Sequence, residues 1–404
     1  MTRKFLRNAV VLGLLSAIGP FAIDMYLPAL PSIGEDLQAG TAAVQMSLLI
    51  FFLSMGFGQI IVGPISDMIG RKVPLYGGLL LFIIGGIGSA LAPSVEWLIT
   101  FRFIQGLGAC AGMAVPRAIV RDLHTGTDAA RLMSLLMLVF SISPILAPLT
   151  GSVIIETVGW RAVFWAVTGA AVIGVILIAT SLEETRPATE RAGSSLGKAL
   201  AGYRFLMGDG NFLGLTLIAG FGISSFFVYL STSSFILIDY YGLSPTVYSV
   251  FFSINAIAFF SMSQLTGALT ERFGLKRVVR AAVTAYATTM VVLLAVMASG
   301  IESLAVMASL LFIGYGFLGL VIPTTSVLAM EDHGEIAGTA SALMGTLHFA
   351  TGVVAMAVAS LFFNGKPLPM VAGIAGCAVI AFLFAQVTLG RRRVAEIEAE
   401  VPAE

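Results

Sequence analysis

The segment Gly63-Pro64-Ile65-Ser66-Asp67-Met68-Ile69-Gly70-Arg71-Lys72 returns about half a chain later as Gly267-Ala268-Leu269-Thr270-Glu271-Arg272-Phe273-Gly274-Leu275-Lys276. Glycine, a small hydroxyl residue, an acid, a second glycine and a lysine match without a gap. Each copy follows the second long apolar stretch of its half. A pattern repeated at this spacing predicts two related halves in parallel.

Composition places these halves in a lipid bilayer. Hydrophobic residues make up 58% of the 404 residues and charged residues only 11%, more apolar surface than a soluble domain of this length could bury. A spanning helix needs roughly 20 predominantly apolar residues. We expect twelve spans, at residues 9–30, 44–64, 74–93, 97–120, 132–157, 161–182, 211–238, 246–268, 278–300, 303–330, 336–362 and 368–390.

The expected fold class is an all-α polytopic membrane protein with twelve transmembrane helices in two six-helix bundles. One long polar connection, residues 183–210, has six spans on either side and is the predicted cytoplasmic linker. The bundles are then residues 1–182 and 211–390, and residues 391–404 form a cytoplasmic tail.

The arrangement of charge predicts the orientation. With both termini in the cytoplasm, nearly every Lys and Arg lies inside and the opposite loops are acidic, as the positive-inside rule requires. The inside positions are Arg3, Lys4, Arg7, Arg71, Lys72 and the stretches 117–131, 186–204, 272–280 and 391–393, with Arg102, Arg161 and Lys366 as exceptions. The formal net charge of zero offers no basic surface for nucleic acid.

Several other functions are disfavoured by what the sequence lacks. No Gly-x-x-x-x-Gly-Lys-Ser/Thr loop is present, so ATP is not the expected energy source, and no residue pattern suggests an enzyme. We expect no cofactor and no metal. Cys110 and Cys377, the two cysteines, fall within predicted spans, where they are expected to be small packing residues.

The stretch from Gly63 to Lys72 resembles the cytoplasmic loop signature of major facilitator transporters, although its positions 64, 65, 66 and 68 depart from the commonest form. The resemblance implies the major facilitator fold, in which this loop latches the two halves in one access state. Gly63, Asp67, Gly70, Arg71 and Lys72 are then conformational residues. Asp67 can accept bonds from loop amides or pair with a nearby cation.

Asp24 is the first candidate for chemistry. It opens Asp24-Met25-Tyr26-Leu27-Pro28-Ala29-Leu30-Pro31, a run similar to one in the bicyclomycin and chloramphenicol resistance branch of drug/proton antiporters. A lone carboxylate in an apolar helix costs a few kcal/mol unless it faces a cavity, is paired or is protonated. Burial favours the protonated form, which suits a proton carrier. The alternative is a helix-end acid at the membrane surface.

Arg102 is the second candidate. It opens Arg102-Phe103-Ile104-Gln105-Gly106-Leu107-Gly108-Ala109, similar to the fourth-span signature Arg-x-x-Gln-Gly-x-Gly-Ala. Arg102 and Asp24 each lie about 9 Å inside the same end of their spans, so the two charges are predicted to pair at one level. A structural alternative is pairing of Arg102 with backbone carbonyls. Gly106 and Gly108 match Gly314 and Gly316 of the tenth span, but Arg102 then matches Leu310, which places proton chemistry in the first half.

The fifth span carries Pro144, Ala147, Pro148 and Gly151, in a stretch that resembles the Gly-x-x-x-Gly-Pro-x-x-Gly signature of antiporters, with serine and alanine in place of two glycines. In the family this signature marks exporters. From the residues alone it is a kinked helix with small contact positions. Polar and aromatic residues within spans are candidate substrate contacts, and Gln105, Tyr229 and Asn255 are the ones we select.

The function expected is a proton-coupled exporter of small amphipathic compounds, a multidrug/proton antiporter that works by alternating access. Uptake of a metabolite by proton symport on the same fold is the first alternative, and a transport-inactive membrane sensor is the second. The expected partners are a small-molecule substrate, protons and the lipid bilayer, without nucleic acid. We expect a monomer in the bacterial inner membrane, with many passes.

Overall fold

The structure is a computed structural model that describes residues 3–124, 126–191 and 195–400, and within these ranges the chain forms helices and turns without a strand. Twelve helical stretches of the described residues are long and apolar enough to cross a membrane, as predicted. The chain is therefore a multi-pass membrane protein. We call the membrane face where α1 begins the terminal face, and the other the far face.

Six spans precede the linker and six follow it. The elements before the linker are α1 (Arg3–Asp24), η1 (Leu27–Ala29), α2 (Leu30–Asp36), α3 (Thr41–Ile69), α4 (Lys72–Ala90), α5 (Val95–Leu123), α6 (Gly126–Val158) and α7 (Arg161–Ser181). The linker contains η2 (Ala188–Glu190) and α8 (Leu196–Gly208). The remaining elements are α9 (Gly210–Ser234), η3 (Phe235–Tyr240), α10 (Pro245–Gln264), α11 (Thr266–Phe273), α12 (Leu275–Ala298), α13 (Leu304–Met330), η4 (Glu331–Ile336), α14 (Ala337–Phe362) and α15 (Pro367–Glu400).

Most span boundaries lie within a few residues of the prediction, and two spans differ in kind. The first is broken after Asp24 and resumes as η1 and α2. The eighth, expected at 246–268, ends at Gln264, and the separate helix α11 follows. The tail continues α15 as helix to Glu400, while the side chains of residues 391–400, all of residues 401–404, and the side chains of Arg3 and Lys4 lie outside the described part of the chain.

The chain divides into two compact units. The first consists of residues 1–201 and 231–253, and the second of residues 202–230 and 254–404. The far-face ends of α9 and α10 therefore belong to the same unit as α1 to α7. The two six-helix bundles divided at 183–210 stay a prediction, because this grouping follows packing in one conformation.

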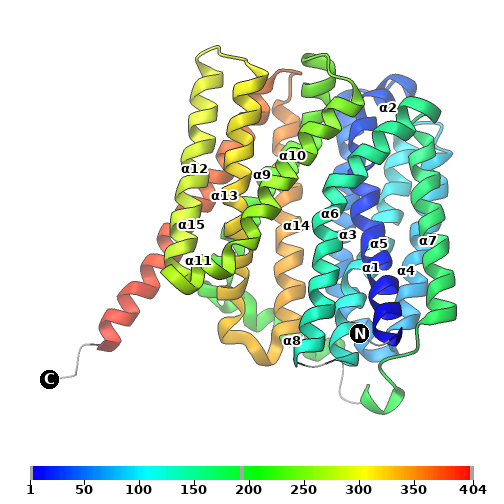
Figure 1. Cartoon of the computed structure of the whole chain (residues 1–404), viewed down its shortest axis with the longest axis vertical. Coiled ribbons are helices and arrows are strands. Elements are labelled where there is room, and N and C mark those ends of the chain that lie inside the picture. The colour runs from blue at the N-terminus through cyan, green and yellow to red at the C-terminus, as the bar shows by residue number, and fades with distance from the viewer. Residues whose placement is uncertain (1–2, 125, 192–194, 401–404) are drawn as a thin grey trace. The chain divides into compact units, whose positions relative to one another are not determined.

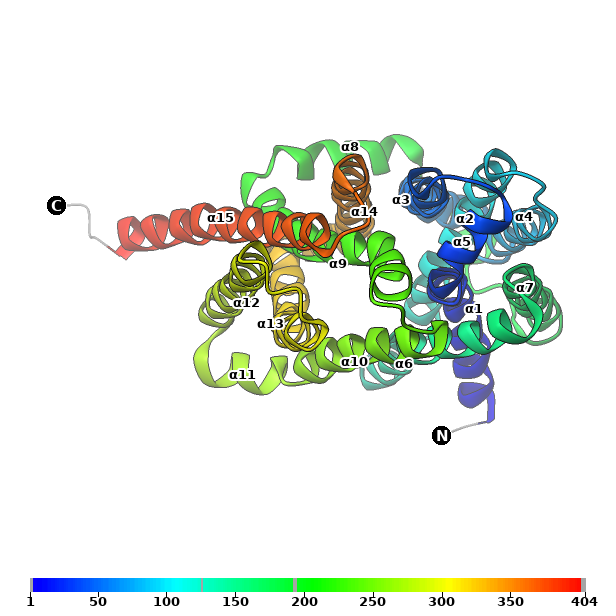
Figure 2. The same ribbon diagram turned by 90° about the horizontal axis from the view of Figure 1, so that it is seen from above.

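In the first unit α5 packs along α3 and α4, and α1 packs against α5, α6 and α7 (Figure 2). Small residues let these helices approach closely. A Cβ on Gly108 would lie 2.4 Å from the backbone nitrogen of Phe82 in α4, and one on Gly106 would lie 2.4 Å from the carbonyl of Phe51 in α3. Glycines at these positions are thus required by direct backbone contact.

In the second unit α12 packs against α13 and α15 (Figure 1). Gly319 of α13 again marks a close approach, because a Cβ there would lie 2.1 Å from the carbonyl of Phe259 in α10. The last turns of α15 extend away from the other helices of this unit. The tenth-span glycines of the sequence echo, Gly314 and Gly316, have no such close backbone contact, because a Cβ on Gly314 would meet side chains and one on Gly316 would meet no atom closer than 3.4 Å.

Candidate functional site

Asp24 lies at the break of the first span. Pro28 has no N–H, so the Asp24 carbonyl lacks the donor that a continuous helix would supply four residues later. The Tyr26 N–H turns back to the Ile23 carbonyl at 3.2 Å, which leaves the Ala22 carbonyl without its helical donor. The Asp24 side chain is buried, at 6% exposure, and forms no hydrogen bond or ion pair with the described residues. Asp24 is therefore a buried acid at a break within the first candidate span, Phe5–Asp36.

Arg102 is fully buried beside the same turn. Its Nη1 donates to the Ala22 carbonyl at 3.4 Å and to Gln105 Oε1 at 2.8 Å. The guanidinium carbon lies 4.0 Å from the ring centroid of Phe51 and 4.5 Å from that of Tyr26. Nε and Nη2 have no partner among the described residues. The cation is thus held by aromatic faces, the Gln105 side-chain oxygen and the freed Ala22 carbonyl.

The direct ion pair between Asp24 and Arg102 is absent from this conformation, within the part of the chain that is described. Their predicted common depth is correct, since Arg102 bonds the backbone two residues before Asp24. The bond goes to the backbone because the helix break frees the Ala22 carbonyl. The structural alternative for Arg102, pairing with backbone carbonyls, therefore applies here.

Gln105 lies inside the first unit. Its side-chain oxygen accepts the bond from Arg102, and its Nε2 has no partner among the described residues. A Cβ on Gly85 would lie 2.5 Å from the Gln105 backbone nitrogen, so α4 covers this residue closely. Gln105 orients Arg102 in this conformation, and its substrate contact stays a prediction.

Tyr229 and Asn255, both chosen as substrate contacts, come together in the second unit. Asn255 Nδ2 donates to the Tyr229 hydroxyl at 3.2 Å. The Tyr229 ring lies 5.8 Å from that of Tyr315, whose hydroxyl donates to the Ser225 carbonyl at 3.3 Å. This buried aromatic and polar cluster joins α9, α10 and α13, and its role in substrate contact stays a prediction.

The loop between α3 and α4 contains the densest polar network, which we call the Arg71 cluster (Ser66, Asp67, Arg71, Asp122 and Glu184). Arg71 donates two hydrogen bonds to the Asp122 carboxylate, from Nε at 2.7 Å and from Nη2 at 3.1 Å. Its Nη1 donates to Asp67 Oδ1 and to Ser66 Oγ, each at 2.7 Å. Of the two options for Asp67, pairing with a cation is the one observed.

The linker closes this cluster from the other side. Glu184 accepts the backbone N–H groups of Arg71 at 2.8 Å and Lys72 at 3.1 Å. Arg186 Nε donates to the Asp67 carbonyl at 3.0 Å. A positive φ of 98° at Gly70 presents these amides, and a Cβ there would lie 2.7 Å from Glu184 Oε2. Sequence reasoning missed Asp122 and Glu184, although each is an acid within an otherwise basic stretch.

Electrostatics stabilises the charged forms in the Arg71 cluster. Burial opposes the charge on Arg71, but the carboxylates of Asp122 and Asp67 outweigh burial and raise the pKa of Arg71. Burial also opposes ionisation of Glu184, but the N–H groups of Arg71, Arg186 and Lys72 outweigh it and lower the pKa of that carboxyl. Arg71 and Glu184 therefore stay ionised at neutral pH.

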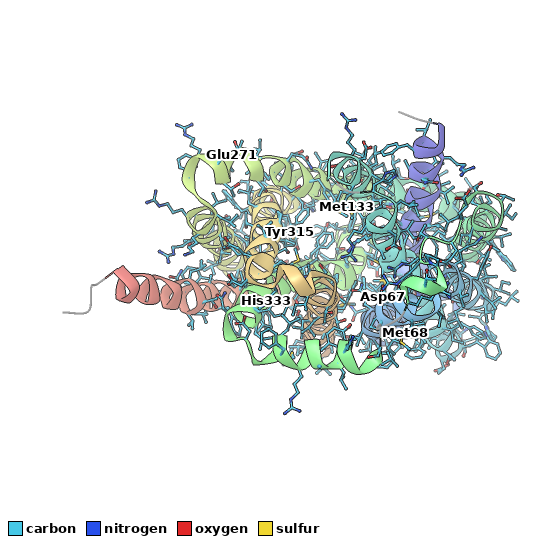
Figure 3. The ribbon with its side chains drawn as sticks, turned by 90° about the horizontal axis from the view of Figure 1, so that it is seen from below. Asp67, Met68, Met133, Glu271, Tyr315 and His333 are labelled. Carbon is cyan, nitrogen blue, oxygen red and sulfur yellow. The ribbon has the colours of Figure 1, made fainter. Side chains whose placement is uncertain are left out.

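The repeated copy lacks the arginine at the centre of this network. Gly274 has a positive φ of 81°, like Gly70, but Leu275 occupies the place of Arg71 and has no group to donate. Arg272 instead lies 5.2 Å over the Phe273 ring. Figure 3 shows Glu271 on the helix that ends at Phe273, and Asp67 beside Met68 at the end of α3. The loop signature is duplicated, but its ion-pair network is not.

The fifth-span signature packs against the break at Asp24. A Cβ on Gly151 of α6 would lie 2.5 Å from the Met25 carbonyl, so this glycine allows α6 to touch the unwound turn directly. Ala147, one turn earlier, is fully buried. Pro144 and Pro148 lie within α6, which continues through both. Two motifs that are far apart in sequence thus meet at one place.

Four side-chain contacts, which we call the far-face contacts, tie the outer ends of α9 and α10 to α3 and α6 within the first unit. They join Gln45 Nε2 to the Ser231 carbonyl at 3.0 Å, Ser249 Oγ to the Pro148 carbonyl at 2.9 Å, Ser253 Oγ to the Ile145 carbonyl at 2.9 Å, and Thr246 Oγ1 to Glu156 Oε2 at 2.9 Å. The π-helical turn η3 follows the first of these contacts. The contacts are few and polar, so each is individually weak.

Twelve apolar spans, a buried acid at a helix break and a buried arginine on the same turn define a polytopic membrane protein with intramembrane charge. The sequence profile of the Major Facilitator Superfamily matches residues 12–356, and the chain belongs to this superfamily of transporters. It is a transporter rather than an enzyme.

Curated relatives are similar over most of the chain. A Bacillus subtilis (strain 168) protein described as an uncharacterized MFS-type transporter, YdgK, is 38% identical and the match covers 87% of this chain and 88% of the relative. The bicyclomycin resistance protein homolog of Haemophilus influenzae is 26% identical, over 93% and 94% of the two chains. Multidrug resistance protein D of Escherichia coli (strain K12) is 29% identical, over 88% and 89%.

Solved structures share the fold. The D-xylose-proton symporter superimposes with a TM-score of 0.73 at 17% sequence identity, covering 94% of this chain and 97% of that one. The human organic anion transporter MFSD10 gives a TM-score of 0.68 at 19% identity, covering 96% and 100%. At these identities the likeness concerns the architecture alone.

Proposed function

We propose that the protein is a proton-coupled exporter of small amphipathic compounds in a bacterial inner membrane. The observation that carries the proposal is Asp24, a buried carboxylate without a protein partner, at an unwound turn that also contacts Arg102. An acid in this setting can exchange a proton at modest cost when water reaches it. No other acid that lies within a described span away from its ends is available for this role.

Export is favoured over uptake by two further points. Relatives matched over nearly the whole chain have names that refer to bicyclomycin and multidrug resistance. The fifth-span motif associated with exporters packs on the turn that holds Asp24, through Gly151. The symporter among the structural neighbours shares the fold at 17% identity and gives no direction of transport.

In the proposed cycle the protein opens alternately to the cytoplasm and to the periplasm. The terminal face is the cytoplasmic one, by the positive-inside rule, and both termini lie there. In this cycle the far-face contacts form and break on the periplasmic side, and the Arg71 cluster is the cytoplasmic latch that reorganises. Because the far-face contacts consist of one or two hydrogen bonds each, they can break without a large free-energy cost.

Proton exchange takes place in the first unit, at Asp24. When Asp24 is ionised, Arg102 on the same turn attracts it, and the turn tightens. A periplasmic proton neutralises Asp24 and releases this attraction, while substrate binding from the cytoplasm favours loss of the proton inside. The cycle then exchanges an inward proton for an outward substrate.

Reconstitution tests this function. The purified protein is placed in liposomes with a trapped pH-sensitive dye, a pH gradient is imposed, and phenicols, bicyclomycin, sulfonamides and lipophilic cations are added in turn. We expect proton flux that depends on one of these compounds. Absence of substrate-dependent flux with every compound, together with accumulation of a metabolite in cells, would replace export by symport.

A further inference from the structure

Arg117 is a second arginine within the membrane, and the proposed mechanism does not use it. It lies on α5, six residues before the end of the span at Leu123, or about 9 Å inside the terminal face at 1.5 Å per residue. Its guanidinium carbon lies 5.2 Å from the ring centroid of Phe140 in α6. Phe140 is nine residues beyond the start of its span at Arg131, so both residues lie below the membrane surface.

Arg117 differs from Arg71 and Arg161 of the first unit because no acid of the described residues pairs with it. Its Nε is buried and has no hydrogen-bond partner, and no carboxylate of the described residues forms an ion pair with it. Arg71 is bound by Asp122 and Asp67, and Arg161 by Asp36. Among the described residues, Arg117 contacts the face of Phe140.

The surroundings of Arg117 along α5 are cationic rather than acidic. Arg121 follows at the fourth position, on the same helix face. The His124 ring packs edge-on against Phe5 of α1, and its buried Nε2 also has no partner among the described residues. Asp122, the acid next to Arg121, is already bound by Arg71. The local field therefore attracts an anion from outside the protein.

An unpaired cation in a transmembrane span is expensive, so it marks a functional site by default. A guanidinium presents a planar fork of donors that matches the two oxygens of a carboxylate or phosphate. Phe140 offers an aromatic face beside that fork, which suits a planar or apolar body next to the charged group. The ligand chemistry that fits both is an amphipathic organic oxyanion.

We propose that Arg117 and Phe140 form an anion subsite that binds the carboxylate or phosphate group of a transported substrate as it arrives from the cytoplasm. This inference rests on the proposed export function and names its substrate class. The same oxyanion chemistry occurs in the headgroups of anionic lipids. The test therefore separates a soluble substrate from a lipid.

The probes are 2-naphthoate, its neutral methyl ester and cyclohexanecarboxylate, with binding measured by calorimetry on protein in phosphatidylcholine nanodiscs. We expect Arg117→Gln to weaken naphthoate binding about tenfold or more, the loss expected for a charge-assisted bond, and to leave the ester within about twofold. Arg117→Lys should restore part of the affinity. Phe140→Leu should weaken naphthoate more than cyclohexanecarboxylate.

Arg121→Gln is the matched control. It removes the same charge at an exposed position that lies one helical turn from Arg117. If it weakens naphthoate binding as much as Arg117→Gln does, a general field explains the affinity and the subsite is refuted. Equal losses for the acid and the ester, or no binding of naphthoate to the wild type, also refute it. Thermal melting of each variant in the same nanodiscs shows that the fold is retained.

Two further results distinguish a soluble substrate from a lipid headgroup, and the anion subsite from the export function. Affinity for phosphatidylglycerol nanodiscs that depends on Arg117, without naphthoate binding, would assign the site to lipid and overturn the substrate subsite. Proton flux triggered by neutral compounds and unaffected by Arg117→Gln would also overturn it, while the export function would stand. Lack of flux with any compound would refute the export function itself, whatever naphthoate binding shows.

Discussion

At the scale of single residues, Arg102 is the most constrained side chain of the site. It is fully buried, and two of its nitrogen atoms have no partner among the described residues. Its polar contacts are the Gln105 side-chain oxygen and the Ala22 carbonyl, and the rest are aromatic rings. A buried charge that is so weakly compensated does not stabilise the fold. Its retention therefore points to function.

The substitution Arg102→Met separates these two roles. An apolar side chain of similar length removes the desolvation cost, so we expect a free energy of unfolding within about 1 kcal/mol of the wild type or higher. Substrate-dependent proton flux should fall to about a tenth or less, because an intramembrane charge with a functional partner is lost. Thermal melting and flux in liposomes measure the two quantities.

Arg102→Lys serves as the control, since it keeps the charge and loses the planar stacking. Some flux should return. A large drop in melting temperature for Arg102→Met together with normal flux in the remaining folded protein would show that Arg102 is structural.

Part of this site could be predicted from the sequence. The charges of Asp24 and Arg102 and their common depth follow from residue type and helix rise, which are local properties. The aromatic faces at Tyr26, Phe51 and Phe164 could not be predicted from the sequence. These residues come from three separate parts of the chain. In addition, lipid-facing and buried helix surfaces are equally apolar. The missing ion pair depends on the freed Ala22 carbonyl, and thus on the details of the helix break.

At the scale of elements, the duplicated loop shows what a repeat predicts and what it omits. Both copies end a helix with a positive φ, at Gly70 and Gly274. Only the first copy has an arginine that joins Asp67 to Asp122. The backbone turn follows from the matched glycines, whereas the network depends on Asp122 and on Glu184 of the linker, which are outside the repeated ten residues.

The matched pair Gly70→Ala and Gly274→Ala tests whether the linker contact matters. Each substitution incurs about 1–3 kcal/mol of backbone strain, because only glycine adopts this conformation readily. A Cβ at residue 70 would also meet Arg191 Nη2 at 2.5 Å, whereas one at residue 274 would meet nothing within 4 Å. We expect a larger fall in melting temperature and in transport rate for Gly70→Ala.

Equal effects of the two alanine substitutions would show that the Arg71 cluster is an ordinary turn with no special coupling to the linker.

The two halves also differ in one helix in a way that the sequence did not predict. The span after Pro245 ends at Gln264 and α11 follows as a separate helix, while α3 continues to Ile69.

At the scale of the whole molecule, twelve spans follow directly from composition, because a bilayer admits few alternatives to apolar helices. Which ends pack together does not follow. The far ends of α9 and α10 group with the first six spans through contacts such as those of Gln45 and Thr246. This packing of helix ends is a property of one conformation. The same sequence must allow every conformation of the transport cycle, so it does not predict which ends pack together in one of them.

A reversible crosslink tests alternating access at this scale. Glu156→Cys with Thr246→Cys places two thiols where side-chain oxygens now lie 2.9 Å apart. Oxidation should lower transport to about a tenth or less, because the pair must separate in each cycle, and reduction should restore it. Each single cysteine variant is the control. Full transport by the crosslinked protein would show that these contacts do not open.

The central claim is that Asp24 carries the proton, and one comparison tests it most directly. Wild type, Asp24→Asn and Asp36→Asn are reconstituted side by side; Asp36 is an acid of the same broken span, bound to Arg161. Substrate accumulation driven by a pH gradient and substrate exchange without a gradient are both measured. The account predicts that Asp24→Asn loses gradient-driven accumulation but keeps exchange, while Asp36→Asn behaves as wild type. Gradient-driven export by Asp24→Asn at the wild-type rate would contradict it.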